Sequence, residues 1–371
     1  MHARRICYVT GTRAEFGLMR STLHAIAADR RLEQQLVVTG MHLSRKHGYS
    51  LDRILADGWA VDAIVPWRAT KSGSLASAVG RATAAFAGVF EKLDPHIVLI
   101  CGDRVEPFAA ASAAHIGGYA VAHVHGGDRA MGQVDDSLRH AITKLSHIHF
   151  CATPQSGARV FQLGEQRRRI HVVGAPGLDD LCSLAWSNPS EKIDAVIALH
   201  PESVDEEREY ARARMLLAAV RDAGAETIVI INPNNDPGWR GIARCWTESA
   251  KIKGTTFVGD LPRGRFAALM AAAGVLVGNS SAGIIEAAAL RLGVVNVGSR
   301  QAGRERDANV VDVPWRKAAI TAAITSILRQ RRTKRYSGRS VYGRGDAGKR
   351  IAAVLADVAI NDQLRRKLIR Y

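Results

Sequence analysis

Short apolar segments alternate with amphipathic segments along most of the chain, and this alternation restricts the folds that the chain can adopt. In the first half the apolar segments are ICYVTG, QQLVVTGMH, HIVLICGDR, YAVAHVHGG, HIHFCAT and IHVVGAP, and stretches with helical spacing such as LMRSTLHAIAA occur among them. Strands separated by helices form a parallel sheet that is covered by helices on both faces. The sequence therefore predicts an α/β fold.

A second series of the same kind follows a polar stretch. The stretch LCSLAWSNPSEK, residues 181–192, contains a proline and is predicted to be a linker. Strands are then expected in AVIALHPES, TIVIINPNNDPG, TTFVGDLP, GVLVGNSSAGIIEAAAL and VVNVGSR. Since 371 residues exceed one ordinary domain, we predict Rossmann-like domains over residues 1–180 and 192–345, facing each other across a cleft. Residues 346–371 are predicted to be helical, and one arrangement open to them is packing back against the first domain.

Polar turns follow four of the predicted strands. They are TGTR, TGMH, CGDR and HGGD. Ligands of parallel α/β sheets bind beyond the carboxyl ends of the strands. These turns are therefore the first place where we expect a functional site.

The formal net charge of the chain is +16. Such a charge fits acidic partners, either nucleic acid or phosphorylated metabolites, and it also fits a general bias toward arginine. The densest basic clusters, GEQRRRIH and LRQRRTKRYSGRS, complete no nucleic-acid-binding motif. We expect no nucleic-acid partner.

Cysteine usage and hydropathy indicate the cellular compartment. The five cysteines are widely spaced and form no CxxC pair, and Cys7 and Cys101 fall in predicted buried strands. This pattern is typical of a reducing compartment. The N-terminal sequence MHARRICYVTGTRAEFG has no apolar stretch long enough for a signal peptide, and no run approaches the roughly 18 apolar residues of a membrane span. We expect a cytoplasmic protein without a membrane partner.

The segment VLVGNSSAGIIEAAAL is predicted to be a strand, a tight polar loop and a helix. Ser280, Ser281 and Gly283 would open a helix at Ile284, and Glu286 would lie one turn into it. Free N–H groups at a helix N-terminus bind phosphate, and the carboxylate would reach ribose hydroxyls. A serine cap on an ordinary strand–helix turn is the plain structural alternative.

Two further loops carry arginines. TGTRAEFG places Arg13 after the first strand, and GSRQAGRERDANV supplies Arg300, Arg304 and Arg306 after a later one. Beside a phosphate site these arginines would form a clamp, and otherwise they belong to a solvated basic loop. Neither GxGxxG nor GxxxxGK[ST] occurs, which argues against a dinucleotide fingerprint and a P-loop.

Carboxylates gather around the segment HVHGGDRAMGQVDDSLRHAITKLSH. Asp103 follows an apolar strand in CGDR, Asp128 follows the HGG turn, and Asp135 and Asp136 precede a stretch with helical spacing. Several carboxylates around one pocket suit acid/base chemistry at a carbon–hydrogen or carbon–oxygen bond. A capped helix beside a turn is the structural alternative.

The helical stretch has an apolar stripe made of Leu138, Ala141, Ile142 and Leu145. We expect Asp135 or Asp136 to cap this helix, with Arg139 and His140 flanking the stripe.

The histidines of this segment do not form a compact metal-binding pattern such as HxxxH. His123 and His125 are two residues apart and His140 and His147 are seven residues apart, so neither pair has this spacing. We predict no metal site.

Together these segments are similar to one known family. VTGTRAEFG, VTGMHLS, CGDR, HVHGGD, VDDSLRHAITKLSH, VVGAPGLDDL, PNNDPG, GNSSAGIIEAA and GSRQAGRER resemble, in this order, the hydrolysing UDP-N-acetylglucosamine 2-epimerases of sialic-acid and legionaminic-acid biosynthesis. The resemblance covers roughly residues 6 to 312. It implies two Rossmann-like domains of glycosyltransferase-B type, the first with the acid/base residues and the second binding UDP. It also implies no metal or nicotinamide cofactor, and a homodimer or homotetramer.

The implied reaction converts UDP-GlcNAc and water into UDP and N-acetylmannosamine. A base removes the proton at sugar C2 while UDP leaves C1, and water then adds to the resulting glycal. Asp103 matches one catalytic carboxylate of the family and Asp135 matches a second. Arg139 and His140 match polar residues of the helix that face the pocket.

The resemblance also implies a nucleotide site. The positions that hold uridine diphosphate match Arg13, His200, Ser280, Ser281 and Glu286. The motifs PNNDPG, GNSSAGIIEAA and GSRQAGRER add further substrate-site candidates, namely Asn234, Gly283, Arg300 and Arg304.

The chain departs from this family at one catalytic position. Some relatives have HIEGGE, with the first glutamate as a proposed base, where this chain has HVHGGD. Three explanations remain open at this point: His125 is the base, Asp128 takes over, or the substrate differs.

Several alternative functions are compatible with the fold. The same reaction on a UDP-2,4-diacetamido-2,4,6-trideoxyhexose is one. A non-hydrolysing UDP-GlcNAc 2-epimerase is another, although its HVEAGLR and PEExNR motifs are not present. A glycosyltransferase would need an acceptor site. A polyanion-binding protein would show salt-dependent binding to any duplex.

Overall fold

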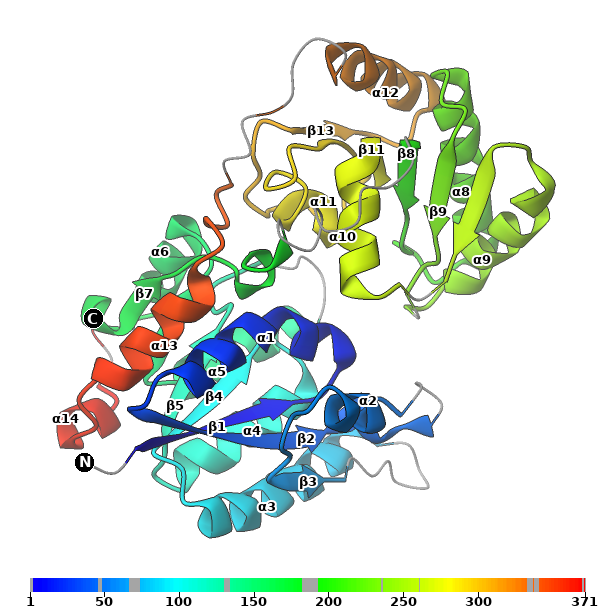
Figure 1. Cartoon of the computed structure of the whole chain (residues 1–371). Helices are drawn as coiled ribbons and strands as arrows, with labels where there is room; N and C mark the ends of the chain where they lie inside the picture. Colours follow the sequence, from blue (N-terminus) through cyan, green and yellow to red (C-terminus); the bar gives the residue numbers. More distant parts are fainter. Residues whose placement is uncertain are drawn as a thin grey trace. The chain divides into compact units, whose positions relative to one another are not determined.

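The chain folds into two compact α/β units. The structure is a computed structural model, and it describes residues 3–45, 49–66, 74–129, 134–181, 193–234, 236–259, 261–331, 336, 340–368 and 370. Unit 1 consists of Met1–Asp179 and Gly345–Tyr371, and unit 2 consists of Asp180–Arg344 (Figure 1). The chain therefore returns to unit 1 at its C-terminal end. From residue 182 onward, the predicted linker lies outside the described residues.

Unit 1 is built on a sheet of seven parallel strands. The strands are β1 (Arg4–Thr10), β2 (Leu32–Thr39), β3 (Ala63–Val65), β4 (Ile97–Cys101), β5 (Ala120–Val124), β6 (Ile148–Cys151) and β7 (Ile170–Val172). Their order in the sheet is β3-β2-β1-β4-β5-β6-β7. The winding direction changes between β1 and β4, and ligands of such sheets bind beyond the carboxyl ends of the strands at this point.

Helices cover both faces of this sheet (Figure 1). They are α1 (Arg13–Ala28), α2 (Leu51–Ala56), α3 (Leu75–Leu93), α4 (Val105–Ile116), α5 (Val134–Leu145), α6 (Pro154–Gln162), α13 (Ala347–Asp357) and α14 (Asp362–Arg365). Side chains of β1 alternate between two buried clusters, as strand geometry requires. Ile6 and Tyr8 pack with α1 and α13, whereas Cys7 and Val9 pack with α3 and α4. An apolar run such as ICYV is thus buried on both faces.

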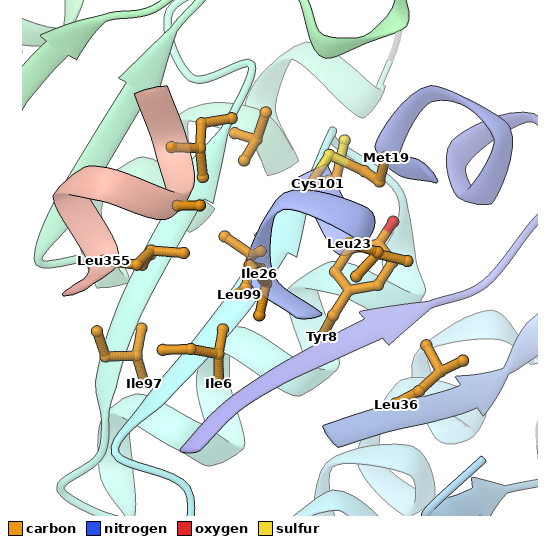
Figure 2. Close-up of a cluster of buried hydrophobic side chains, with 14 of the residues drawn as sticks. Ile6, Tyr8, Met19, Leu23, Ile26, Leu36, Ile97, Leu99, Cys101 and Leu355 are labelled. Atoms are coloured by element: carbon orange, nitrogen blue, oxygen red, sulfur yellow. The ribbon is translucent and has the colours of Figure 1, made fainter. Parts of the chain in front are cut away.

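The C-terminal helix α13 packs against α1. Leu355 of α13 belongs to the same buried cluster as Ile6 and Ile97 of the sheet (Figure 2). Asp179 accepts hydrogen bonds from the backbone N–H groups of Ala347, at 3.0 Å, and of Gly348, at 2.6 Å. The carboxylate satisfies donors that have no partner within the first turn of a helix. The residue at which the chain leaves unit 1 thereby also anchors its return.

Unit 2 repeats the architecture with six parallel strands. The strands are β8 (Ile193–Ala198), β9 (Ile228–Ile231), β10 (Thr255–Val258), β11 (Ala273–Gly278), β12 (Gly293–Val297) and β13 (Val310–Val313), in the order β10-β9-β8-β11-β12-β13. The helices are α8 (Glu206–Asp222), α9 (Trp239–Glu248), α10 (Arg263–Ala272), α11 (Ser281–Ile285) and α12 (Lys317–Arg331). The winding changes between β8 and β11. The prediction of two parallel-sheet α/β domains is confirmed.

Two predicted helix boundaries were wrong. Helix α11 begins at Ser281 and ends at Ile285, so Glu286 is its C-cap and not a residue of its second turn. The next N–H, that of Ala287, bonds to the carbonyl of Ala282, five residues back, which widens the chain out of the α-helical pattern. Helix α5 begins at Val134, so Asp135 and Asp136 lie in its first turn, where negative charge is favourable, and do not cap it.

Other expectations hold in part. The predicted helical tail consists of α13 and α14, with an extended C-cap at Val358 after the first. Cys7 and Cys101 are buried in β1 and β4, as predicted. Among the described residues, no helix is both long and apolar enough to span a membrane.

The close contact of α13 with α1 gives a stability prediction. A Cβ atom on Gly348 would lie 2.7 Å from the backbone nitrogen of Thr22. We therefore expect Gly348→Ala to destabilise unit 1 by about 1–3 kcal/mol through overpacking. The free energy of unfolding, measured in denaturant, tests this expectation.

Gly80 in α3 is the matched control, since a Cβ there would meet nothing within 4 Å. Gly80→Ala should stabilise the protein by up to about 1 kcal/mol through helix propensity alone. Equal stabilisation by both alanines would contradict the close packing of α13 on α1.

Candidate active site

His125 lies directly beyond β5 in a left-handed backbone conformation, with φ of +67°. This conformation is uncommon for residues other than glycine and often occurs at functional sites. The backbone N–H of His125 donates to the carbonyl of Phe150 at 3.0 Å, which ties the loop to β6. Its Nδ1 lies 3.0 Å from Oδ2 of Asp128. Because a carboxylate only accepts, Nδ1 carries the proton, and Nε2 of the neutral ring keeps a lone pair.

Asp128 is a buried carboxylate with both oxygens engaged. Oδ2 accepts from His125, and Oδ1 accepts from the hydroxyl of Ser156 at 2.7 Å. Burial alone would raise the pKa of Asp128, but the hydrogen bonds from His125 and Ser156 and the charge of Arg139 outweigh burial and hold the pKa well below its usual range. Asp128 is therefore ionised at neutral pH, and its geometry suits orienting His125 better than removing a proton from substrate.

The glycine before Asp128 allows this loop to approach α6. Gly127 has φ of +78°, and a Cβ atom there would lie 2.2 Å from the carbonyl oxygen of Ser156. Any larger residue would push Asp128 away from the Ser156 hydroxyl. Gly127, the second glycine of HGGD, therefore needs both a left-handed backbone and close packing.

Arg139 of α5 connects the ends of β4 and β5. Its side chain is buried, and its Nη2 donates to Oδ2 of Asp103. Its Nη1 donates to the backbone carbonyl of His125 at 3.1 Å. The structure therefore brings together four of the predicted catalytic residues, which are Asp103, His125, Asp128 and Arg139.

His123, near the carboxyl end of β5, supports the same loops through hydrogen bonds. Its Nε2 donates to the carbonyl of Gly102 at 2.8 Å, so its Nδ1 accepts from the hydroxyl of Thr143, 3.2 Å away. Burial lowers the pKa of His123 to about 3, and the ring is neutral. This histidine thereby fixes the residue before Asp103 to helix α5.

Two predicted residues of α5 are less engaged. Nε2 of His140 lies 3.6 Å from Oδ2 of Asp136, one turn earlier on the helix. The backbone of Asp135 belongs to the first turn of α5, whereas its side chain lies outside the described residues. Arg13 is exposed at the first position of α1, directly beyond β1. The roles of Asp135, His140 and Arg13 stay predictions.

Sequence reasoning missed two buried carboxyl groups beside this site. Glu15 accepts from the hydroxyl of Tyr8 at 3.0 Å and from the N–H of Gly11 at 3.4 Å. Burial raises its pKa to about 8, so the carboxyl is mostly protonated at neutral pH. Glu106 is buried and accepts from Nε of Arg104 at 3.3 Å. The available signal was the position of Glu15 on the buried stripe of α1.

In unit 2, His200 lies beyond the end of β8, at the point where the winding changes. Its Nδ1 accepts the backbone N–H of Asn234 at 3.1 Å, so its Nε2 carries the proton and is a donor. Asn279, which follows β11, bonds through its side-chain amide to both the N–H and the carbonyl of His200, each at 2.8 Å. Burial lowers the pKa of His200 to about 4. The ring is neutral and presents one N–H group.

Arg300 follows β12 and joins the same group of residues. Its guanidinium donates to Asp236 at 3.1 Å, and Asp236 also accepts from the side-chain amide of Asn234 at 2.6 Å. Oδ1 of Asn234 is buried, and it has no partner within the part of unit 2 that the structure describes. Arg304 lies further along the loop, where its carbonyl accepts from Arg306 at 3.2 Å. Of the predicted clamp, Arg306 also pairs with Asp312, and its role in phosphate binding stays a prediction.

Glu202 organises this arginine loop, and sequence reasoning did not select it. One of its oxygens accepts the N–H groups of Ser299 at 2.9 Å and Arg300 at 2.8 Å. The other accepts the indole N–H of Trp315 at 2.9 Å. The signal was the position of Glu202 in HPES, two residues after His200 at a strand end.

The serine loop after β11 is an N-cap. The side chain of Ser280 accepts the N–H of Ala282 at 3.4 Å, and Ser281 is the first residue of α11. A Cβ on Gly283 would lie 2.9 Å from a methyl group of Val294, so this glycine lets α11 approach β12. Glu286 pairs with Arg263 at 3.1 Å, and burial raises its pKa. The loop follows β11, which neighbours β8 in the sheet, and the role of these four residues in a nucleotide site stays a prediction.

No group of three or more histidine, cysteine, aspartate or glutamate residues with metal-binding geometry occurs in the described ranges. The polar residues at the strand ends of unit 1 pair with one another, as an acid/base site requires. Those of unit 2 present N–H donors and a guanidinium, as an anion site requires.

Comparison with known proteins gives consistent matches. A family model described as UDP-N-acetylglucosamine 2-epimerase matches residues 24–356. The UDP-N,N'-diacetylbacillosamine 2-epimerase (hydrolyzing) of Legionella pneumophila is 36% identical, over 99% of this chain and 100% of the relative. The UDP-N-acetylglucosamine 2-epimerase of Neisseria meningitidis is 31% identical over 86% of each chain.

A solved structure agrees with the fold. The crystal structure of UDP-GlcNAc 2-epimerase from Neisseria meningitidis bound to UDP-GlcNAc has a TM-score of 0.79, at 18% identity, and covers 95% of this chain and 99% of that chain.

The buried carboxyl of Glu15 gives a prediction on pH and stability. Its pKa of about 8 in the folded protein lies above the ordinary value of 4.5. The folded state therefore holds a proton that the unfolded chain loses, and stability decreases as pH rises from about 4.5 to about 8. Glu15→Gln, which is always neutral, should remove a few kcal/mol of this decrease. Unfolding free energies at pH 5 and pH 8.5 measure the difference.

Glu91→Gln, at an exposed position of α3, is the control and should leave the pH dependence unchanged. If Glu15→Gln and Glu91→Gln gave the same pH dependence, Glu15 would not be the group responsible.

Proposed function

The chain belongs to the UDP-N-acetylglucosamine 2-epimerase family, and from this premise we propose that it is a hydrolysing UDP-sugar 2-epimerase. The reaction converts a UDP-sugar and water into UDP and the free sugar with inverted configuration at C2. One observation carries the proposal: the chain of hydrogen bonds from Ser156 through Asp128 to His125, beside the Asp103–Arg139 pair. Asp103, His125 and Asp128 follow β4 and β5, which are adjacent in the sheet, and ligands of parallel sheets bind beyond such strand ends.

His125 is the proposed base of the first step. Its Nε2 takes the proton from sugar C2, the electron pair of that bond forms the C1–C2 double bond, and the C1–oxygen bond breaks as UDP leaves. Asp128 holds Nδ1–H and stabilises the imidazolium that forms, in the way that a carboxylate supports a catalytic histidine. This assignment answers the question raised by HVHGGD in favour of His125.

Asp103 is the proposed group for the second step. Water adds its oxygen to C1, and C2 receives a proton on the opposite face, which inverts its configuration. Asp103 is the candidate for accepting the proton of the attacking water, and its pairing with Arg139 holds the carboxylate in place. Asp135 and His140 remain the candidates for delivering the proton to C2.

Unit 2 is the proposed UDP-binding half. The Nε2–H group of His200, the guanidinium of Arg300 and the serine loop at Ser280 and Ser281 supply donors for a diphosphate. Glu286 remains the candidate for the ribose hydroxyls. Arg13 stays a candidate for the uridine diphosphate, as the family resemblance implies.

The proposed sugar is N,N'-diacetylbacillosamine, a 2,4-diacetamido-2,4,6-trideoxy sugar, carried on UDP. This reverses the order of the expectations from sequence, where UDP-GlcNAc came first. The support is the Legionella relative, which matches the full length of the chain with higher identity than the Neisseria relative does. UDP-GlcNAc is the second candidate, and the Neisseria relative supports it.

The first test is proton NMR of the protein with each UDP-sugar in heavy water. We expect free UDP together with a free sugar that carries deuterium at C2, because the proton removed from C2 exchanges with solvent. Faster turnover of UDP-N,N'-diacetylbacillosamine than of UDP-GlcNAc would support the first substrate. A UDP-sugar epimerised without release of UDP would show the non-hydrolysing reaction and refute hydrolysis.

The roles of His125 and Asp128 are tested by substitution. His125→Gln should lower kcat by about 10²–10⁴-fold, because it removes the base, while UDP affinity stays within about twofold. Asp128→Asn should lower kcat by about tenfold or more, since the ring loses its anionic partner. His24→Gln, at an exposed histidine of α1, is the control. A full kcat in His125→Gln would exclude His125 as the base.

A further inference from the structure

The C-terminal segment after α13 lies at the C-terminal end of α5, the helix that carries Arg139. Arg169 donates to the backbone carbonyls of Gln363 and, at 3.3 Å, of Arg366. The N–H of Arg370 donates to the carbonyl of Gly164 at 3.0 Å, and its guanidinium lies 5.6 Å from the ring centroid of Phe161. The segment is therefore fixed along its length to the elements that follow α5.

Lys367 inserts from this segment at the C-terminal end of α5. Its Nζ donates to the carbonyl of Ser146 at 2.5 Å and lies 3.5 Å from the carbonyl of Thr143. The last carbonyls of a helix have no partner within the helix and carry partial negative charge, so a cation there is stabilising. The side chain of Lys367 is only 9% exposed, which excludes water from these contacts.

Glu165 balances the charge of Lys367. Its carboxylate pairs with Lys367, with Lys144 of α5 at 2.8 Å and with Nε2 of His149 at 3.1 Å. Burial would raise the pKa of Glu165, but these donors outweigh burial and lower it to about 2. Lys144, on α5 itself, and Lys367, from the tail, are thus joined by one buried anion.

The helix end that Lys367 holds is connected to the catalytic loops. The hydroxyl of Thr143 donates to His123, and His123 donates to the carbonyl of Gly102, next to Asp103. One turn earlier on α5, Arg139 bonds to Asp103 and to the His125 carbonyl. A displacement of α5 along its axis would lengthen both connections together.

We propose that Lys367 is a positioning residue for the reaction: by holding the C-terminal end of α5 against Glu165, it keeps Arg139 and Asp103 in register with His125. The proposal rests on the proposed function for its kinetic consequence. It links the active site to a residue 224 positions beyond Thr143 of α5.

The test compares Lys367→Met, Lys367→Arg and Glu165→Gln with wild type. We expect Lys367→Met to lower kcat by about tenfold, because small misplacements of catalytic groups have effects of this size or larger, and to leave KM within about twofold. Lys367→Arg, which keeps a cation at the helix end, should restore most of kcat. Glu165→Gln should lower kcat in the same way and serves in place of Lys367→Met if that variant does not fold.

Hydrogen–deuterium exchange gives a readout independent of activity. The amides of residues 139–146 and 102–104 should exchange about tenfold faster in Lys367→Met, because α5 is less restrained. Lys349→Met, at an exposed lysine of α13, is the matched control and should match wild type in both measurements. If kcat and exchange in Lys367→Met equal those of Lys349→Met, the positioning role is refuted.

The two proposals fail in different ways. If wild type turned over neither UDP-sugar, the proposed function would be wrong, and the exchange measurement alone would decide whether Lys367 positions α5. If wild type were active and the Lys367 and Glu165 variants were as active as Lys349→Met, the function would stand and the inference would be wrong.

Discussion

The strand ends of unit 1 depend on the buried guanidinium of Arg139, which is 5% exposed. A charge removed from water is tolerated only with a counter-charge and hydrogen-bond acceptors nearby. Asp103 and the carbonyl of His125 supply them, and these groups follow β4 and β5, two adjacent strands. The pairing therefore forms only when α5 lies across both strand ends. A single buried charge thus fixes the helix, and the helix fixes the relative positions of the proposed acid and base groups.

The two histidines around β5 show how one strand separates structural from chemical roles. His123 points to Gly102 and Thr143, is neutral and completes a support for the loop of Asp103. His125, beyond the strand end, meets the carboxylate of Asp128. Residues two apart on a strand share a face, but His125 lies past the end of β5 in a left-handed backbone conformation, so its side chain meets different neighbours. The partner at Nδ1 then decides what each ring can do. A neutral ring between a carbonyl and a hydroxyl transfers no proton, whereas a ring beside an ionised carboxylate can accept one.

The sequence predicted the strands well where both faces are buried, because such strands are continuous apolar runs. It missed β3 and β13, which are short strands at the sheet edges and only partly buried.

Asp103 and Arg139 could be selected from their places at a strand end and on a helix, but their pairing joins residues 36 positions apart and needs the fold. Glu202 was missed because its backbone donors, Ser299 and Arg300, come from a distant loop, and Glu15 because its hydroxyl donor, Tyr8, comes from β1. The helix end at Ile285 depends on hydrogen bonds that local composition, rich in alanine, does not reveal.

His125 and His200 show that the same residue at comparable places in two units can meet opposite chemical demands. His200 lies just beyond β8, which borders the switch point of its sheet. His125 lies just beyond β5, the neighbour of β4, and β4 borders the switch point of the other sheet. At His125 the carboxylate of Asp128 accepts a hydrogen bond from Nδ1–H, so Nε2 is an acceptor. At His200 the backbone N–H of Asn234 donates to Nδ1, so Nε2 is a donor. An acceptor suits the removal of a proton from carbon, and a donor suits a phosphate oxygen. The difference arises from a single neighbouring group in each case, a carboxylate in one unit and a backbone amide in the other.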